Sequence, residues 1–489
     1  MDITENVCNV VPKKNGALPE KVLQIGEGNF LRAFADWMID KMNTAGLFGG
    51  SVVMCQPTAH GAAEKLNAQD CEYTVLMRGI ENGRKMERSD VVTSVARCLD
   101  PYRDFDAVKA VAASPDLKVI ISNTTEAGIA YRPGDKLDDA PPISYPAKLT
   151  ALLWERFKST GGRGGGLLIL PVELIKRNGD SLRALVLRYA DEWGLTPEFV
   201  RWLGRKVCFA NTLVDRIVTG FPKNEISVIN ARLGYEDDIL VACEPYYEWI
   251  IEAPKRWRQV LPFEKAGLNV AWVDDVEPYR TRKVRILNGT HTMNALAAYL
   301  SGCESVSEMM RDADFSRIIP SALSSEIIPN IALPRETLSA FAESVLERFS
   351  NPFIKHRLLD ISLNSVSKYR ARCLDSLSET YSRTGSLPPV LCFALAALIE
   401  FYKGREENGR YFGLRGGEKY EIRDSARTLA FFSEAWARGD AVRAVLSNTD
   451  FWGRDLTLLG GLTEETEKNV EYIEKYGMRR AVSELARRM

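Results

Sequence analysis

The sequence predicts an α/β protein in two parts, a parallel-sheet half followed by a mainly α-helical half. Three observations support this class. Short β-rich runs alternate with helical stretches over the first half, which is typical of a parallel sheet with crossover helices. From about residue 280 onward that strand pattern is absent and long helical stretches dominate. The length of 489 residues favours at least two domains, because single cores rarely exceed about 300 residues.

Four apolar runs predict the clearest strands of the first half. They are KVLQIG (21–26), SVVMCQP (51–57), LKVIISN (117–123) and GLLILPVEL (166–174). Continuous apolar runs of this kind belong to strands that are covered on both faces. Between the first two, residues 30–46 show apolar side chains at helical spacing and stop at Gly46, which predicts a helix with a glycine cap.

The second half is predicted to be helical. We place the boundary in NVAWVDDVEPYRTRK (269–283), where the last strand-like run ends, which gives domains 1–275 and 276–489. The apolar run VLCFALAALIEFY (390–402) contains Glu400 and is shorter than the roughly 20 residues of a membrane span, so it predicts a buried helix. The expected helical stretches are 281–300, 305–314, 335–349, 352–380 and 388–403.

Charge and cysteine content exclude several classes of function. The 64 Lys and Arg residues balance 65 Asp and Glu residues, so no excess charge attracts nucleic acid or an anionic membrane. The nine cysteines are scattered without a C-x-x-C pair, and we expect reduced, mostly buried thiols. The N-terminus lacks the basic-then-apolar order of a secretory signal, which favours a cytoplasmic protein.

The first predicted strand is followed by a loop that is typical of nucleotide-binding turns. In IGEGNFLRAF, Gly26 and Gly28 lie between the strand and the next helix. Glycines allow the tight turn and close backbone approach that a pyrophosphate needs, and the first N–H groups of the helix face the anion. Leu31 occupies the third glycine position of G-x-G-x-x-G, so an ordinary strand-to-helix turn remains an alternative.

Two further loops follow predicted strands, at the sheet edge where ligands bind. The second strand ends MCQPTAH (54–60), without the Asp or Glu that grips the ribose of NAD or the Arg that favours NADP, so it leaves the cofactor type open. We expect His60 in this loop to be a surface residue. The loop ISNTTEAG (121–128) offers four polar side chains to a cofactor: Asn123, Thr124, Thr125 and Glu126. Helix capping by one of the two threonines is the alternative.

The stretch KVRILNGTH (283–291) combines a lysine and an asparagine with one of only three histidines. In a regular α-helix at about 100° per residue, Lys283, His291 and Asn288 lie near roughly 0°, 80° and 140°, so one broad face presents all three. Reduction of a ketone by hydride requires a proton donor and hydrogen-bond donors at the developing alkoxide. A lysine partly removed from water releases its proton more readily, so Lys283 is a candidate acid and base. The alternative is an exposed lysine beside a structural histidine.

Metal-dependent and serine-hydrolase chemistry find little support. The three histidines, at positions 60, 291 and 356, have neither an H-x-x-x-H spacing nor cysteine pairs beside them, so we expect no metal site. No G-x-S-x-G motif is present.

Six ordered landmarks resemble the polyol-specific long-chain dehydrogenases of the mannitol dehydrogenase family. They are IGEGNFLRAF, NTTEAG, NTLVDRIV (211–218), CEPYYEWII (243–251), KVRILNGTH and RFSNPFIKHRL (348–358), from about residue 20 toward the C-terminus. The resemblance implies a Rossmann-type N-terminal domain that binds NAD, a mainly helical C-terminal domain and no metal. On this pattern Lys283 is the general acid and base, and Asn288 and His291 bind and polarise the reacting oxygen. The residues around the cofactor would be Gly26, Glu27, Gly28, Asn29, Phe30, Asn123, Thr124 and Glu126.

Within the family, the chain resembles the members that interconvert D-tagaturonate and D-altronate in hexuronate catabolism. GDKLDDAPPISYPAKLT (134–150) and NPFIKHRLLDISLN (351–364) carry that likeness. Mannitol and fructuronate members have Cys-Asp-Asn where this chain has Val172-Glu173-Leu174. Leucine cannot give the substrate the hydrogen bond that asparagine gives, so that contact is not expected here.

A hexuronate in a water-poor cleft needs a cation or a fork of donors for its carboxylate. SKYRAR (367–372) provides Lys368 and Arg372 four residues apart on one helical face, and the resemblance puts Lys368 at a substrate contact. A solvated basic face is the alternative for Arg370 and Arg372. Further candidates are His356, Arg357, Asp215 and Arg216. The alternative for Asp215 and Arg216 is a structural ion pair.

Two alternatives to this function stay open. One is another reaction of the same family, on fructuronate or on a neutral hexitol such as mannitol. The other is a catalytically inactive protein that binds a sugar acid or a nucleotide on this scaffold. A small-molecule partner is expected in each case, with no nucleic acid or membrane partner, and the sequence does not predict the oligomeric state.

Overall fold

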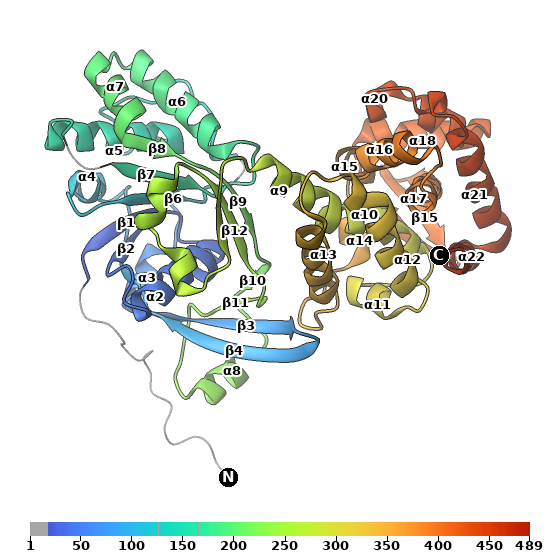
Figure 1. Ribbon diagram of the computed structural model, residues 1–489, viewed down its shortest axis with the longest axis horizontal. Helices are drawn as coiled ribbons and strands as arrows, with labels where there is room; N and C mark the ends of the chain where they lie inside the picture. The colour runs from blue at the N-terminus through green and yellow to red at the C-terminus, as the bar shows by residue number, and fades with distance from the viewer. Residues whose placement is uncertain (1–17, 126, 164–165) are drawn as a thin grey trace, which may run out of the picture. The chain divides into compact units, whose positions relative to one another are not determined.

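The computed structural model describes residues 18–125, 127–163 and 166–489. These residues form two compact units (Figure 1). The first contains the described residues up to Gly79 together with Lys85–Val276. The second contains Ile80–Arg84 and Glu277–Met489.

A six-stranded sheet forms the centre of the first unit. Its strand order is β5-β2-β1-β6-β7-β8, and all its neighbouring strands are parallel. The chain order runs outward from β1 in both directions, so it reverses between β1 and β6, which is where doubly wound sheets bind ligands. All four predicted strands are confirmed. The strands are β1 (Glu20–Ile25), β2 (Ser51–Cys55), β5 (Val95–Leu99), β6 (Val119–Ser122), β7 (Leu167–Pro171) and β8 (Val207–Phe209).

Helices cover both faces of this sheet, as the continuous apolar runs predict. In β1, Val22 packs on the side of the first helix, whereas Leu23 and Ile25 pack on the opposite side. Figure 1 shows α4 to α7 gathered on that opposite side. The first helix consists of α1 (Asn29–Leu31), the π-helical turn η1 (Arg32–Asp36) and α2 (Trp37–Thr44). The other helices are α3 (Ala63–Ala68), α4 (Phe105–Ala113), α5 (Tyr145–Thr160), α6 (Asn178–Glu192), α7 (Pro197–Lys206) and α8 (Ile226–Leu233).

Two smaller sheets complete the first unit and were not predicted strand by strand. The four-stranded sheet has the order β10-β11-β3-β4 and the three-stranded sheet the order β13-β12-β9. Their strands are β3 (Tyr73–Glu81), β4 (Arg84–Val92), β9 (Asn211–Asp215), β10 (Val218–Gly220), β11 (Val241–Cys243), β12 (Glu248–Glu252) and β13 (Val270–Val273). Two 3-10 turns, η2 (Lys255–Gln259) and η3 (Phe263–Ala266), precede β13.

The first helix ends as predicted, but it is not a regular α-helix. Gly46 has a φ of +68° and follows the last turn, where the N–H of Leu47 bonds to the Met42 carbonyl. A buried polar cluster anchors the π turn to β1. Gln24 Nε2 donates to Asp36 Oδ2 at 3.1 Å, and the hydroxyl of Tyr73 donates to the same oxygen at 3.2 Å. Burial raises the pKa of Asp36 to about 7.

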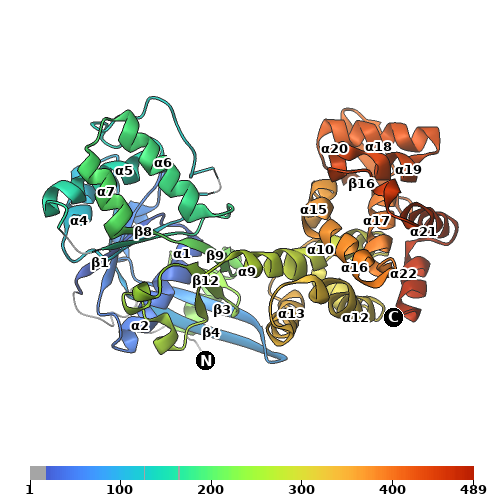
Figure 2. The ribbon, with the colours of Figure 1, turned by 45° about the horizontal axis from the view of Figure 1, so that its top comes forward.

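Helices dominate the second unit, as the sequence predicts. α17 (Pro389–Phe401), the apolar run predicted to be a buried helix, packs on α10, α12, α19, α21 and α22 (Figure 2). The other elements are α9 (Glu277–Arg282), η4 (Lys283–Asn288), α10 (Gly289–Leu300), α11 (Val306–Arg311), α12 (Phe315–Ala322), η5 (Leu323–Ile327), η6 (Ile328–Asn330), α13 (Arg335–Phe349), α14 (Leu358–Ile361), α15 (Ser365–Arg372), α16 (Leu374–Thr384), α18 (Ala426–Arg438), α19 (Ala441–Ser447), α20 (Thr449–Trp452), η7 (Leu456–Leu458), α21 (Leu462–Tyr476) and α22 (Met478–Arg487).

Two predictions for the second half were wrong. The helix expected over 352–380 is three helices, α14 to α16. Asn364 adopts a φ of +55° and breaks the helix between α14 and α15, and the second break follows Arg372, where α15 ends. An antiparallel sheet, β14-β15-β16, was missed. Its strands are polar and exposed, but the Asn408-Gly409 and Gly416-Gly417 dipeptides at its turns signal hairpins. The strands are β14 (Gly404–Glu407), β15 (Arg410–Arg415) and β16 (Glu418–Ile422).

The described cysteines are free and mostly buried, as their scattered positions predict. Eight of the nine cysteines lie in the described residues as free thiols, and all of these except Cys208 are buried. Within the same residues, no helix is both long and apolar enough to cross a membrane.

Replacement of the buried Asp36 by asparagine should change stability in a pH-dependent way. Because its folded pKa of about 7 exceeds the usual value, the stability that its neutral form contributes is present at low pH and is lost as pH rises through about 7. The difference in Tm, Asp36→Asn minus wild type, should therefore increase by a few degrees, roughly 2–6 °C, between pH 5 and pH 8. Thermal unfolding at several pH values measures this. Asp106→Asn, at an exposed carboxylate of α4, is the control, and a pH-independent difference for Asp36→Asn would contradict the argument.

Candidate active site

The turn after β1 is a close-packed cradle at the edge of the sheet. Gly26 has a φ of +124°, and a Cβ atom there would lie 2.8 Å from the Asn123 carbonyl oxygen, so only glycine fits. Gly28 precedes the first helical residue, and nothing lies within 4 Å of its side-chain position. Phe30 stacks on Phe34 with ring centroids 5.0 Å apart. This combination of a tight glycine turn, free space and a helix start fits the pyrophosphate of a dinucleotide.

Arg32 fixes the backbone of this turn from within the π-helical segment. Its guanidinium donates to the Glu27 carbonyl at 3.1 Å and to Asn29 Oδ1 at 2.6 Å, and it also bonds the Ile239 carbonyl. The Glu27 carboxylate accepts a hydrogen bond of 3.0 Å from the backbone N–H of Ala62, in the loop after β2. The predicted cofactor residues Glu27 and Asn29 are therefore held by the protein in a fixed geometry.

The loop after β6 lies against the same turn. The N–H of Asn123 donates to the Ile25 carbonyl at 3.0 Å. Thr124 donates twice to Glu173 Oε1, from its N–H and its hydroxyl, each at 2.9 Å, and Ser122 donates to Glu173 Oε2 at 3.1 Å. Burial raises the pKa of Glu173.

These contacts test one of the two sequence-based interpretations of the loop, the helix cap. No described helix starts at it, since the next one is α5, so the helix-capping alternative was wrong. Glu173, which sequence reasoning did not assign to the loop, holds it in place. Leu174 is 62% exposed. Glu126 lies outside the described residues.

A pocket of about 740 Å³ lies at the carboxyl ends of β2 and β5. Its charged lining contains Glu64, Asp100, Arg103 and Asp104, together with His60, which is exposed as expected. Arg103 lies 3.5 Å from Asp100 and 3.9 Å from Glu64. The second strand does not end in a carboxylate, but Glu64, Asp100 and Asp104 from neighbouring segments bring carboxylates to this pocket.

The segment KVRILNGTH contains a π-helical turn, so the regular α-helix assumed from the sequence was wrong. Residues Lys283–Asn288 form η4, and the N–H of Gly289 bonds to the Val284 carbonyl five residues earlier. A π turn brings residues five apart over one another, whereas α-helical spacing separates Lys283 and Asn288 by about 140°. Both side chains are half-buried and belong to one turn of the helix.

His291 is a buried, neutral imidazole. Its ring stacks on Phe349 with centroids 4.0 Å apart and meets the ring of His356 edge-on at 4.9 Å. Burial lowers the pKa of His291 well below its usual range, and the charges of His356, Arg372, Arg348 and Lys368 lower it further. Nε2 of His291 has no hydrogen-bond partner in the described part of the chain.

Three basic side chains surround His291, and we call Arg348, Lys368 and Arg372 the cationic cluster. Arg372 Nη1 donates to Thr292 Oγ1 at 3.2 Å, and Lys368 Nζ donates to the Ile361 carbonyl at 2.8 Å. Burial lowers the pKa of Lys368, and the nearby charge of Arg372 lowers it further. Neither Lys368 nor Arg372 forms an ion pair with any described residue.

The remaining predicted substrate residues have other surroundings within their own units. Arg370 is exposed and donates to the backbone of α20, at Asp450 and Phe451. Arg357 is exposed at the start of α14. Asp215 and Arg216 lie buried in the first unit.

Arg216 has a structural role there. Its guanidinium donates to the carbonyls of Glu244, at 3.0 and 3.1 Å, and Ala33, at 2.5 Å, and it lies over the rings of Trp37 and Tyr247. Among residues 18–125, 127–163 and 166–489, no three His, Cys, Asp or Glu side chains gather as metal ligands.

Two family models match the chain. The mannitol dehydrogenase Rossmann domain matches residues 20–265, and the mannitol dehydrogenase C-terminal domain matches residues 275–474. Together they cover most of the sequence.

Characterised relatives and solved structures agree with these matches. The altronate oxidoreductases of Halalkalibacterium halodurans and Klebsiella pneumoniae are each 44% identical to this chain, over 97% and 96% of it and 95% and 97% of their own lengths. A D-sorbitol dehydrogenase in substrate-free form superposes with a TM-score of 0.80 at 23% identity, over 95% of each chain. A Pseudomonas fluorescens mannitol 2-dehydrogenase complex with NAD and D-mannitol gives 0.68 at 21% identity, over 96% of this chain and 95% of that one. The solved structures support the fold.

Because the chain contains only three histidines, the protonation of His291 can be followed by the signal of its own side chain. Because burial and neighbouring positive charge lower the pKa of His291 well below its usual range, its imidazole should titrate at a lower pH than free histidine does. Nuclear magnetic resonance of protein carrying ¹⁵N-labelled histidine, titrated from pH 8 to 5.5, measures this, and His291→Asn identifies the resonance. Titration of that resonance near the pKa of free histidine would refute the electrostatic argument.

Proposed function

The chain belongs to the mannitol dehydrogenase family, and we propose that it interconverts D-tagaturonate and D-altronate by hydride transfer with NAD(H). As a member of this family it is a dehydrogenase that acts on a CH–OH group with a nicotinamide dinucleotide. The observation that carries the substrate assignment is 44% identity, over almost the full length of both chains, with enzymes named altronate oxidoreductase. The cationic cluster, in which Arg348 is buried and Lys368 and Arg372 are half-buried, supports a substrate that has a carboxylate.

The first unit would hold the dinucleotide. The Gly26 to Phe30 turn fits the pyrophosphate, because a Cβ at Gly26 would strike the Asn123 carbonyl and the space beside Gly28 is free. Asn123 and Thr124 would border the cofactor from the loop after β6. When bound, the nicotinamide supplies the hydride in reduction and accepts it in oxidation.

The charges of the adjacent pocket favour NAD over NADP. Glu64, Asp100 and Asp104 bring three carboxylates to this pocket, and Arg103 lies within ion-pair distance of the first two. A 2′-phosphate placed there would meet more negative than positive charge, whereas ribose hydroxyls can donate to the carboxylates. Lower kcat/KM with NADPH than with NADH is the expected result for the wild-type enzyme.

Lys283 is proposed as the general acid and base. During reduction the ketone oxygen gains negative charge as hydride reaches its carbon, and the Lys283 ammonium transfers a proton to that oxygen. In oxidation the lysine amine takes the proton from the hydroxyl. Asn288 lies one π turn away and can donate its amide hydrogen to the same oxygen. The neutral His291 imidazole, whose Nε2 has no described partner, provides the third hydrogen-bonding group.

The cationic cluster is proposed to bind the hexuronate carboxylate. Half-buried cations that lack an ion-pair partner, as Lys368 and Arg372 do among the described residues, are costly, and a carboxylate ligand that accepts charge-assisted hydrogen bonds from them offsets that cost. Lys368 and Arg372 project from one face of α15, four residues apart.

A cytoplasmic location is part of this proposal, since free buried thiols suit a reducing compartment.

Removal of the Lys283 amine tests the reaction itself. Lys283→Met should lower kcat in both directions by roughly 10²- to 10⁴-fold, because it removes the proton donor, while NADH binding is unchanged. Absorbance at 340 nm with tagaturonate and NADH, or with altronate and NAD, measures the rate. Lys355→Met, at an exposed lysine of the same unit, is the control. Wild-type rates in Lys283→Met would exclude the proposed role.

The pair Arg372 and Arg370 tests substrate choice. Arg372→Met should lower kcat/KM for tagaturonate by roughly 10- to 100-fold, because a charge-assisted hydrogen bond to the carboxylate is lost, and change the rate with the neutral ketose fructose far less. Arg370→Met should leave both values unchanged, since that side chain bonds to the backbone of α20. Wild-type enzyme that prefers fructose or fructuronate would defeat the tagaturonate assignment.

A further inference from the structure

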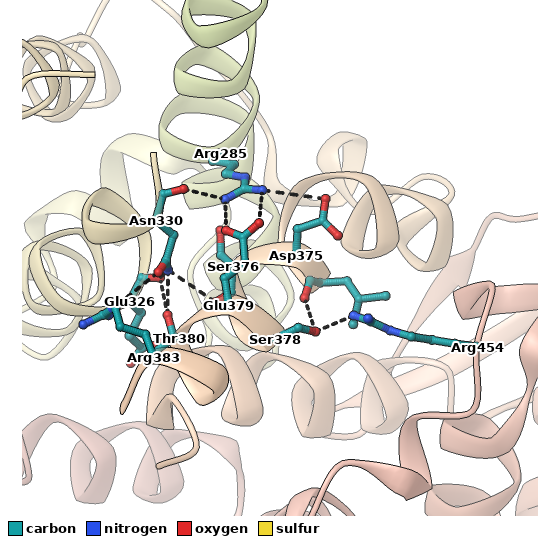
Figure 3. A network of polar contacts seen from close by, with 11 residues as sticks. Arg285, Glu326, Asn330, Asp375, Ser376, Ser378, Glu379, Thr380, Arg383 and Arg454 are labelled. Atoms are coloured by element: carbon teal, nitrogen blue, oxygen red, sulfur yellow. Dashed lines mark hydrogen bonds and ion pairs between the residues drawn. The ribbon is translucent and has the colours of Figure 1, made fainter. Parts of the chain in front are cut away.

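The π turn that carries Lys283 and Asn288 is attached to α16 by one arginine. Arg285, in the middle of η4, forms a bidentate ion pair with Glu379 of α16, one arm of which is 2.9 Å. Arg285 Nη1 also donates to the Asn330 carbonyl at 3.0 Å. Figure 3 shows the guanidinium between Asn330 and Glu379, with Asp375 farther along α16. The Arg285 side chain is 12% exposed and the Glu379 side chain is 47% exposed, so the ion pair is shielded from water on the arginine side only.

Asn330 is itself fixed, which makes its carbonyl a rigid acceptor. Its amide nitrogen donates to the Glu326 carbonyl and to Thr380 Oγ1, each at 2.7 Å. Arg383 Nε donates to Asn330 Oδ1 at 3.2 Å. These bonds connect the end of η5 and η6 to α16 (Figure 3). Arg285 therefore bonds to two elements that are already bound to each other.

The residue just after the π turn, Gly289, contacts the junction between α15 and α16. A Cβ atom at Gly289 would lie 3.2 Å from the Arg372 carbonyl oxygen, and Cys373 Sγ lies 3.8 Å from the Gly289 carbonyl. Arg372 ends α15 and Cys373 joins it to α16. The segment that carries the proposed proton donor is thus fastened by Arg285 to α16 and by Gly289 to the junction of α15 and α16, and α15 carries Lys368 and Arg372.

We infer that Arg285 and Glu379 are positioning residues, which hold the π turn so that Lys283 and Asn288 keep a fixed distance from the carboxylate-binding side chains of α15. This inference rests on the proposed function. A π turn has poorer packing than an α turn and persists where tertiary contacts hold it. The Arg285 fork supplies such a contact, because two parallel hydrogen bonds fix orientation as well as distance. Neither residue is proposed to touch the substrate.

Glu379→Gln removes one charge and one arm of the fork at nearly constant shape. With tagaturonate and NADH, we expect kcat to fall by roughly 10- to 100-fold, because small displacements of a reacting group are costly. KM for NADH should stay unchanged, since the cofactor turn is in the first unit. Glu379→Asp, which keeps the charge, should recover part of the lost kcat. Asp375→Asn is the matched control, because Asp375 lies on the same helix, is 70% exposed and approaches Arg285 only to 3.7 Å.

Hydrogen exchange of the backbone amides gives a readout that does not depend on activity. In Glu379→Gln, a peptide covering residues 283–291 should exchange faster than in wild type and in Asp375→Asn, because the π turn loses its tether. If Glu379→Gln does not fold, Arg285→Lys carries the same test, since lysine keeps the charge without the fork.

The outcomes separate this inference from the proposed function. Reduced kcat with faster exchange at 283–291 supports the positioning role. Exchange equal to wild type, or kcat within twofold of wild type while Lys283→Met is inactive, overturns it and leaves the proposed function standing. If the wild-type enzyme does not reduce tagaturonate, the proposed function fails, and the exchange measurement alone still supports or overturns the tether.

Discussion

In each unit, an arginine within a π-helical turn binds a neighbouring segment, and both proposed binding segments depend on this interaction. In the first unit, Arg32 lies in η1 and binds the backbone of the turn that would receive a pyrophosphate. In the second, Arg285 lies in η4 and binds Glu379 and the Asn330 carbonyl. A π turn widens the helix and realigns side chains, and it needs outside contacts to persist. A guanidinium is suited to this task because its rigid fork fixes two or three acceptors at once.

The second constraint is the burial of positive charge near a neutral imidazole. The cationic cluster lies around His291, whose pKa burial and these charges lower. Lys368 and Arg372 are half-buried and have no ion-pair partner among the described residues, which is costly. In the proposed function a bound carboxylate offsets that cost, so the same residues that disfavour a protonated histidine would favour an acidic substrate. Electrostatics thus connects the state of the site without substrate to the class of substrate proposed for it.

The first unit shows how a sheet positions a loop that has little sequence signature. Reversal of strand order between β1 and β6 brings Gly26 against the Asn123 carbonyl. Glu173, from the end of β7, then fixes the loop after β6 through Ser122 and Thr124. The acidic lining from which a preference for NAD is proposed includes Asp100 after β5, one strand away from the position where such a residue is usually sought.

The sequence by itself determined the parallel sheet, the helical second half and the segments that carry polar chemistry, because apolar periodicity and glycine turns are local properties of the chain. It predicted Lys283, Asn288 and His291 as one group, and it could not separate Arg370 from Arg372. Only the tertiary structure decided that Arg372 lies beside His291 whereas Arg370 bonds to α20, that residues 283–288 form a π turn, and that Glu379 holds it. These features depend on hydrogen bonds and charges between residues up to 94 positions apart. A local sequence pattern does not predict which distant residue a side chain will contact.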